Sequence, residues 1–220
     1  ERFFDAAQNA RLVADAERYY RAMYYGSKTS WNLRDSHMFD TLRSLLAFYG
    51  PESKGIVWEH NSHVGDATAT EMSVRGEHNV GQLCRTTLGE RVYIIGFGTD
   101  HGTVAAASNW DEPMQRMRIV PAREGSYERV FHDTAIPAFS LHLRRPERRA
   151  VRDELTPPLL ERAIGVVYRP ETELQSHYFH AKLPRQFDEY IWFDETNAVH
   201  PLAVRSRPSA DLPETYPFGL

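Results

Sequence analysis

Two histidines separated by two residues form the part of this sequence that is best suited to chemistry. His60 and His63 lie in the string His60-Asn61-Ser62-His63. An imidazole exchanges protons near neutral pH, and two rings three residues apart in an extended loop can face the same point. We therefore predict that His60 and His63 are catalytic, as groups that activate or position water. The alternative, from the residues alone, is that both are ordinary loop or helix-capping histidines.

Polar side chains near these histidines are candidates for contacts with a substrate. Glu59 and Asn61 flank the first histidine of the string. Arg34 can bind a carboxylate or phosphate group through two parallel hydrogen bonds, and Asp35 can orient a histidine ring. We predict that all four residues contact the substrate. For Arg34 and Asp35 the alternative is a helix N-terminus that Asp35 or Ser36 caps.

Metal binding is a second use for the same side chains, because imidazoles and carboxylates are ligands for zinc and iron. A metal site would use His60 and His63 as ligands, with Glu59 and Asp66 beside them. The two histidines do not have the i, i+4 spacing of the helical zinc hydrolases. We therefore predict that the protein uses no metal and no other cofactor.

Other well-known catalytic motifs are missing from the sequence. It contains no Gly-x-Ser-x-Gly string, no phosphate-binding loop and no Gly-x-Gly-x-x-Gly after a predicted strand. These observations argue against a serine hydrolase, a nucleoside triphosphatase and a dinucleotide-dependent enzyme. Arg162 is expected to be an ion-pair partner, and His177 and His180 could form a second imidazole pair.

Hydrophobic periodicity predicts the elements that position these side chains. Apolar residues at three- and four-residue steps predict amphipathic helices over residues 2–25 and 32–49. The apolar run at residues 55–58 predicts a strand buried on both faces, which would place the two histidines in a loop at its carboxyl end. In an open α/β sheet, ligands bind outside the carboxyl ends of the strands. Further helices are predicted at residues 79–87 and 126–133, and further strands at residues 91–97, 103–107, 138–143, 163–168 and 187–193.

The length and the alternation of elements predict one α/β domain. The 220 residues are 41% hydrophobic, which is enough for a core. Strands that alternate with helices favour a mainly parallel sheet that helices cover on both faces. We predict a single domain over residues 1–220. We expect this domain to be incomplete, a fragment of a longer protein, because the chain begins at Glu1 inside a predicted helix and without an initiator methionine.

Charge and cysteine content indicate the partners and the compartment. The net charge is −4, and acidic and basic residues are mixed along the chain, so there is no basic stripe for nucleic acid. No apolar run approaches the roughly 20 residues that cross a bilayer, and the amino terminus lacks the layout of a signal peptide. The single cysteine, Cys84, allows no intrachain disulfide and suits a reducing compartment. We expect a cytoplasmic protein that contacts neither nucleic acid nor membrane.

Several segments resemble the carboxyl-terminal part of the erythromycin esterase family in their order and spacing. The most specific of them is Trp58-x-His60-Asn61-x-His63. The supporting segments are Asn32-x-Arg34-Asp35 with Met38, Gly81 with Leu88-Gly89, Tyr93 with Ile95-Gly96-Phe97, residues 162–168, Phe187-Asp188 and Asp194-x-Thr196. The resemblance extends from about residue 32 to residue 202.

This resemblance implies both a fold and an activity. The family fold is a three-layer α/β/α sandwich around a mainly parallel sheet. The family activity is hydrolysis of an ester, in the best-known members a macrolide lactone, by a histidine that activates water without a covalent intermediate. Family members place a general-base histidine and partner glutamates in an earlier Gly-Glu-x-x-His-Gly segment, which this sequence does not contain. A histidine of the Trp-x-His-Asn-x-His string lines the same cleft.

The resemblance therefore implies His60 as the first catalytic candidate and His63 as the second. The expected function is that of a hydrolase acting on a small-molecule ester. Two alternatives stay open at this point. One is a non-catalytic ligand-binding domain, and the other is a metal-dependent hydrolase that uses His60 and His63 as ligands.

Overall fold

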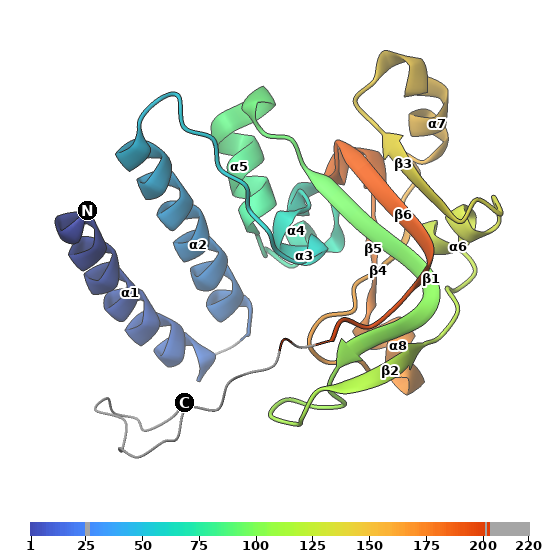
Figure 1. Cartoon of the computed structure of the whole chain (residues 1–220), viewed down its shortest axis with the longest axis horizontal. Helices are drawn as coiled ribbons and strands as arrows, with labels where there is room; N and C mark the ends of the chain where they lie inside the picture. Colours follow the sequence, from blue (N-terminus) through green and yellow to red (C-terminus); the bar gives the residue numbers. More distant parts are fainter. Residues whose placement is uncertain (25–26, 201, 203–220) are drawn as a thin grey trace.

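Two long helices and a strand-rich part make up the chain (Figure 1). The structure is a computed structural model, and it describes residues 1–24, 27–200 and 202. The helices are α1 (Arg2–Met23), α2 (Ser27–Tyr49), α3 (Asn61–Val64), α4 (Glu71–Val74), α5 (Val80–Leu88), α6 (Tyr127–His132), α7 (Arg149–Glu154), α8 (Glu173–Ser176) and α9 (Leu183–Gln186). The strands are β1 (Ile95–Ala106), β2 (Gln115–Ile119), β3 (Ala138–His142), β4 (Leu159–Arg162), β5 (Tyr178–Ala181) and β6 (Glu189–Thr196).

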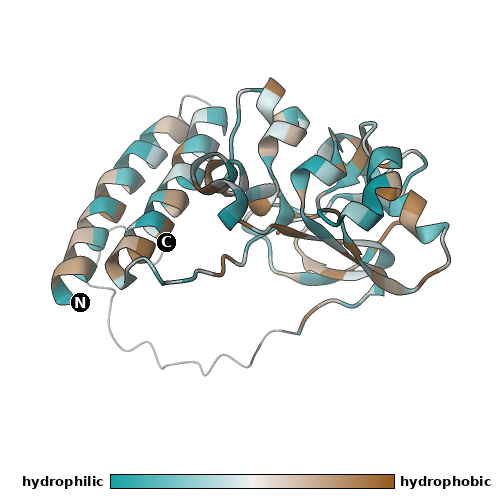
Figure 2. Ribbon diagram, turned by 90° about the horizontal axis from the view of Figure 1, so that it is seen from above, coloured by the Kyte–Doolittle hydropathy of each residue, from teal (hydrophilic) through white to brown (hydrophobic). Residues whose placement is uncertain are grey.

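The helices α1 and α2 lie side by side as an antiparallel pair (Figure 1). The rings of Phe4 and Phe48 stack between them with their centroids 4.4 Å apart. Polar and apolar residues are interspersed along both helices in Figure 2, and the predicted apolar residues Phe3, Val13 and Tyr20 of α1 are exposed. Both predicted helices are confirmed, although α2 begins five residues earlier than predicted. The last residue of the first predicted helix, Tyr25, lies outside the described residues.

A four-stranded sheet with the order β2-β1-β6-β3 is the centre of the strand-rich part. The helix α6 covers one face of this sheet, and the core there includes Phe131, Tyr190 and Trp192. The strands β4 and β5 form a separate antiparallel pair. The chain therefore has an α/β fold, with helices packed against a central sheet.

The sheet is mixed, so the predicted parallel character is confirmed only in part for the described residues. The strands β1 and β6 are parallel, whereas β2 pairs antiparallel with β1 and β3 pairs antiparallel with β6. The connection between β1 and β2 covers only residues 107–114. A parallel neighbour needs a crossover of a dozen or more residues, so a connection of this length produces a hairpin.

The predicted strand at residues 55–58 does not form. These residues belong to no strand, and the side chains of Ile56 and Trp58 are 92% and 86% exposed. Apolar residue types indicate a tendency to be buried, but a strand also needs a neighbour for its backbone hydrogen bonds. No described strand pairs with this segment. The two histidines therefore follow an irregular segment and not the carboxyl end of a buried strand.

Two other predicted strands differ from the structure in their bounds. Residues 91–97 and 103–107 contribute to one long strand, β1, which continues through Gly102 at a φ of +115°. A Cβ atom at Gly102 would overlap the carbonyl oxygen of Thr196, so glycine is required there. Residues 163–168 lie beyond the end of β4, and within them Val167 forms an isolated bridge with Ala107.

The predicted helices and strands with clear local end signals are confirmed. The side chains of Asn79 and Ser126 cap α5 and α6, as the sequence predicted for Ser126. The predicted strand at residues 138–143 is β3, and the last predicted strand is β6, shifted by two residues at its start. Among the helices that the structure describes, none combines the length and the apolar character needed to cross a bilayer. The prediction of one domain over residues 1–220 stays a prediction.

Candidate active site

The ring of His60 is fully engaged with the protein. His60 is the N-cap of α3, and its Nδ1 accepts a hydrogen bond from the backbone N–H of Ser62 at 3.2 Å. Its Nε2 lies 2.9 Å from the carbonyl oxygen of Ile164. A carbonyl can only accept, so Nε2 carries the proton and the ring is neutral. Neither nitrogen is left for a substrate proton while these hydrogen bonds persist.

Burial gives His60 a measurable effect on stability. Burial lowers the pKa of His60 below its usual value, and the hydrogen bond to the Ile164 carbonyl only partly opposes this. The unfolded chain therefore binds a proton more readily than the folded protein. The free energy of unfolding therefore begins to decrease as the pH falls through about 6.5, the pKa of the histidine in the unfolded chain. The decrease ends once the pH is below the lower pKa of His60 in the folded protein.

We expect the substitution His60→Asn to make stability less dependent on pH. Asparagine can still cap α3 but does not titrate. The measurement is the free energy of unfolding in urea between about pH 7 and pH 5, and the variant should show a smaller decrease than the wild type. Equal decreases in the two proteins would contradict the buried, neutral assignment of His60.

The ring of His63 differs, because one of its nitrogens has no hydrogen-bond partner in the part of the chain that the structure describes. Its Nδ1 lies 3.0 and 2.9 Å from the two carboxylate oxygens of Asp35, which is fully buried. A carboxylate accepts, so Nδ1 holds the proton and Nε2 carries the lone pair. Within the described residues, Nε2 makes no hydrogen bond. The indole ring of Trp31 stacks on the imidazole at 4.5 Å and 7°, which fixes the plane of the ring.

Asp35 is held in place from three elements and does not cap a helix. It lies inside α2, so the alternative in which Asp35 or Ser36 caps a helix N-terminus is wrong. One carboxylate oxygen accepts a hydrogen bond from the backbone N–H of Val80, the first residue of α5, at 3.2 Å. The carboxylate therefore joins α2, α3 and α5, and it orients His63 in the way expected of a residue that supports a catalytic histidine.

Two further charged groups lie around this pair. Burial raises the pKa of Glu59, and its electrostatic neighbours are His63, Asp35 and Arg34. The Oε2 atom of Glu59 is buried and has no hydrogen-bond partner among the described residues. The guanidinium of Arg34 is exposed and lies 5.0 Å from the centre of the Trp31 ring. Glu59 and Arg34 are thus positioned to meet a polar ligand group near His63.

A cavity of about 1140 Å³ begins beside this cluster. Its polar residues include Glu59, His60 and Asn61, and most of its other lining residues are apolar. Arg34 and His63 do not line it, so this cavity brings together only some of the residues predicted to act on or contact a substrate. Glu59 is the residue that connects the two, because it lines the cavity and interacts electrostatically with His63.

Asn61 has a different setting from the one predicted for a substrate contact. Its amide nitrogen donates to the carbonyl oxygen of Phe97 at 2.7 Å, and its amide oxygen accepts from the N–H of Phe97 at 3.1 Å. Both ends of the amide are used in this way. Asn61 therefore attaches α3 to β1 and sets the position of the histidine string.

Trp31 and Asn79 support this site although the sequence did not single them out, and the structure supplies the reason for Gly81. The side chain of Asn79 donates to the carbonyl oxygens of Ser62 and Gly65, which holds the turn after His63. A Cβ atom at Gly81 would overlap the carbonyl oxygen of Val64, so glycine allows α5 to approach α3. The only local signal for Asn79 was its place as a helix cap, and Trp31 gave none beyond its residue type.

The remaining candidates from the sequence lie apart from this site. His177 and His180 do not pair: Nε2 of His177 accepts from the N–H of Arg169, whereas Nδ1 of His180 contacts Glu71 at 2.6 Å. Arg162 is a buried ion-pair partner of Glu173, as predicted. Among the described residues, the one group of three or more side chains that could hold a metal ion includes neither His60 nor His63.

Comparisons with known proteins give a consistent result. A family model described as erythromycin esterase matches residues 1–196. Solved structures with a similar fold include a Bacillus cereus protein, with a TM-score of 0.64 and 20% identity over 79% of this chain and 41% of that protein. A succinoglycan biosynthesis protein has a TM-score of 0.61 and 18% identity, over 79% of this chain and 40% of that protein.

A third structure is a mutant of the erythromycin esterase EreC in its open conformation, with a TM-score of 0.52 and 18% identity. The alignment covers 80% of this chain and 40% of that protein. At these identities the structural comparisons establish similarity of fold. The chain spans about two fifths of the length of each of the three proteins.

Proposed function

Because the chain belongs to the erythromycin esterase family, we propose that it supplies part of the active site of a hydrolase that cleaves a small-molecule ester. Family membership supports a hydrolase-like function in general terms. The observation that carries the more specific proposal is the contact between His63 and Asp35, which leaves the Nε2 lone pair of His63 free of any described residue. This geometry favours His63 over His60, the reverse of the order that the sequence suggested.

In the proposed reaction, Nε2 of His63 removes a proton from water while the water oxygen attacks the ester carbonyl carbon. The buried carboxylate of Asp35 stabilises the imidazolium that forms and keeps Nδ1 protonated. The carbon–oxygen bond to the alcohol then breaks, and the proton on Nε2 passes to the leaving alkoxide. The products are a carboxylic acid and an alcohol, and no covalent enzyme intermediate forms.

The other residues have supporting roles in this proposal. Arg34 faces the carbonyl oxygen or an anionic group of the substrate, where its guanidinium stabilises negative charge. The unpartnered Oε2 of Glu59 binds a hydroxyl group of the substrate or the attacking water. His60 and Asn61 hold α3 in position, since their ring and amide groups are bonded to the backbone at Ile164 and Phe97.

The proposal also covers the part of the active site and of the fold that lies outside this sequence. The relatives with solved structures are about twice as long as this chain. The family resemblance implies a Gly-Glu-x-x-His-Gly segment that this sequence lacks. We infer that residues outside this sequence contribute a further proton-transfer group to the same cleft. They would also complete the three-layer α/β/α sandwich of a cytoplasmic enzyme that needs no nucleic acid or membrane partner.

A large apolar ester is the substrate class that the cavity favours. Its lining includes the exposed side chains of Ile56, Trp58 and Phe97. The rings of Trp58 and Phe97 lie 6.3 Å apart and offer an apolar surface near Glu59. A macrolide lactone has this character, so it is the first substrate to test.

Hydrolysis by the natural protein that carries this sequence should survive chelation of metal ions. The proposed base needs no metal, and both nitrogens of His60 are already bonded within the protein. We expect kcat/KM for the ester to stay within about twofold after dialysis against a chelator, measured well below the unfolding temperature of the chelated protein. Activity that disappears on chelation and returns with zinc or iron would overturn the metal-free mechanism.

Ligand binding without catalysis is the second candidate, favoured by the observation that His63 does not line the cavity. In that case an ester would bind to the natural protein without being hydrolysed. Its affinity would respond to changes at Trp58 but not at His63. Turnover that depends on His63 would exclude this candidate.

A further inference from the structure

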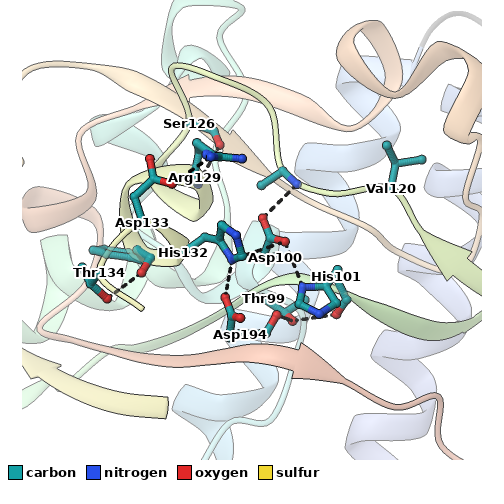
Figure 3. A network of polar contacts seen from close by, with 12 residues as sticks. Thr99, Asp100, His101, Val120, Ser126, Arg129, His132, Asp133, Thr134 and Asp194 are labelled. Carbon is teal, nitrogen blue, oxygen red and sulfur yellow. Dashed lines mark hydrogen bonds and ion pairs between the residues drawn. The ribbon is translucent and has the colours of Figure 1, made fainter. Parts of the chain in front are cut away.

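A group of four side chains that could bind a metal lies in the strand-rich part. Asp100 and His101 are on β1, His132 is the last residue of α6, and Asp194 is on β6. The ligand atoms of all four lie within 4.8 Å of one another. Figure 3 shows the carboxylate of Asp100 between the two imidazole rings, with Asp194 next to His132.

The register of the sheet brings two carboxylates together. The strands β1 and β6 are parallel, and their register pairs Thr99 with Phe193 and His101 with Glu195. Asp100 and Asp194 are therefore adjacent on neighbouring strands. Like charges in this relation are destabilising unless a cation lies between them. Asp100 is also 2% exposed, so water cannot screen its charge well.

No arginine or lysine side chain among the described residues supplies that cation. Arg129 lies nearby, but its guanidinium is paired with Asp133 at 2.9 Å. The groups that contact the two carboxylates are the imidazoles and the backbone N–H of Ala122, which donates to Oδ1 of Asp100 at 3.0 Å. This leaves Oδ2 of Asp100 directed at the two rings.

We propose that Asp100, His101, His132 and Asp194 form a binding site for a divalent transition-metal ion, with Zn²⁺ as the best fit. Two nitrogen and two oxygen donors suit zinc and its neighbours, whereas magnesium and calcium prefer oxygen ligands alone. Tetrahedral zinc with bonds near 2.0–2.1 Å requires donor atoms about 3.3 Å apart.

Three of the six separations between the donor atoms lie within 1 Å of this value, and all six are at most 4.8 Å. His132 Nδ1 lies 2.7 Å from Asp194 Oδ1 and 3.6 Å from Asp100 Oδ2, and His101 Nδ1 lies 2.9 Å from Asp100 Oδ2. Shifts of less than 1 Å in these separations would bring them to the tetrahedral value. The two rings are nearly perpendicular, at 87°, so both can point a nitrogen at one centre without stacking. On coordination each ring carries its proton on Nε2.

The ion has a structural role in this proposal, because four protein ligands leave no position open for a substrate. It ties the end of α6 to the parallel pair of strands β1 and β6. Hydrogen bonds from outside the site hold the ligands in place, as is usual for metal ligands. The guanidinium of Arg162 donates to the backbone carbonyl oxygen of Asp100 at 2.6 Å, and Ala122 fixes its carboxylate. The site is separate from His63, so this inference does not depend on the proposed esterase function.

The test is titration of the tag-free, chelator-treated protein with Zn²⁺ by calorimetry, with Mg²⁺ as the comparison ion. We expect one zinc ion per chain, little binding of magnesium, and a rise in Tm of about 5–10 °C when free zinc is 100-fold above Kd. Co²⁺ bound in the same site should give the intense visible absorption of a four-coordinate ion.

Variants at the site distinguish it from other zinc-binding positions. Asp194→Asn and His132→Gln should each weaken zinc binding about 100-fold or more, because loss of a ligand costs at least as much as loss of its supporting hydrogen bond. The matched control is His142→Gln, since His142 contacts Glu189 at 3.1 Å in a similar ion pair on the same sheet. The control should bind zinc like the wild type.

Two results would overturn the proposal. One is a wild-type protein that does not bind zinc or cobalt, in which case the four residues are only ion pairs. The other is unchanged zinc binding by the double variant Asp194→Asn with His132→Gln. If a variant does not fold, the wild-type protein still provides the test. The number of zinc ions bound per chain and the absorption spectrum with Co²⁺ show whether it has a four-coordinate metal site.

Discussion

Replacing His63 with glutamine in the natural protein that carries this sequence should lower kcat/KM for the ester by about 10²–10⁴-fold, the usual contribution of a general base. The substitution removes the ring whose Nε2 receives the proton from water. It also removes a hydrogen bond to the buried carboxylate of Asp35, which should cost about 1–3 kcal/mol of stability. Activity should therefore be compared under conditions where circular dichroism shows that the variant is folded.

A matched control distinguishes the loss of the catalytic base from the loss of a histidine–carboxylate contact. His37 contacts Asp15 at 2.8 Å between α2 and α1, away from the proposed site. The substitution His37→Gln should leave kcat/KM within about twofold. A loss of activity at His37 equal to that at His63 would show that the effect comes from folding.

His63 and Asp35 should also act as one catalytic unit. Asp35→Asn removes the charge that stabilises the imidazolium, so it should lower kcat by itself. If His63 and Asp35 act together, the double variant loses little more than the more damaging single variant. Losses that multiply would mean that the two residues act independently and would remove the proposed role of Asp35.

His60 gives a second comparison within the same string. Because both of its ring nitrogens are bonded to the protein, His60→Asn should reduce activity by a smaller factor than His63→Gln. The reverse order would restore His60 as the leading catalytic residue.

Replacing Arg162 with methionine should destabilise the protein by about 3–5 kcal/mol. The side chain is 3% exposed and forms an ion pair with Glu173 at 3.2 Å. Its guanidinium also donates to the backbone carbonyl oxygens of Thr99, Asp100 and Val120 at 2.6–2.7 Å. Methionine removes the Arg162 donor from three carbonyl groups, and each unsatisfied group carries a desolvation cost. It also leaves the buried Glu173 carboxylate without its counter-ion, although the Tyr168 hydroxyl still donates to that carboxylate.

Urea unfolding monitored by circular dichroism measures this effect. Arg169→Met is the matched control, because Arg169 is exposed and its contacts to Ser108 and Asn109 lie at the surface. The control should change the free energy of unfolding by no more than about 0.5 kcal/mol. If Arg162→Met does not fold at all, Glu173→Gln tests the same network at a smaller cost. A change below about 1 kcal/mol in a folded Arg162 variant would contradict the network.

The sequence by itself determined the family and the elements that have strong local signals. The string Trp58-x-His60-Asn61-x-His63, together with the supporting segments from residue 32 to residue 202, indicated the erythromycin esterase family, and the family match confirms it. Hydrophobic periodicity over many residues predicted α1 and α2, and a capping residue located the start of α6. These signals are local, since helix hydrogen bonds and caps join residues only a few positions apart.

Strand assignment showed the limit of local information. Residues 55–58 have the apolar character of a buried strand, yet Ile56 is exposed and the segment pairs with no described strand. The mixed sheet could not be deduced either, because strand direction depends on which strands meet. Backbone pairing in a sheet joins distant residues, as β1 and β6 illustrate with partners 94 positions apart.

Only the tertiary structure decided what each polar side chain can do. The sequence ranked His60 ahead of His63. In the structure the Ile164 carbonyl oxygen is bonded to Nε2 of His60, whereas Asp35 orients His63 and leaves its Nε2 without a partner among the described residues. The proposed metal site combines residues of β1, α6 and β6, and no short motif contains them. The physical reason is the same in both cases. The chemistry of an imidazole depends on the partners of its two nitrogens, and folding brings those partners from distant parts of the chain.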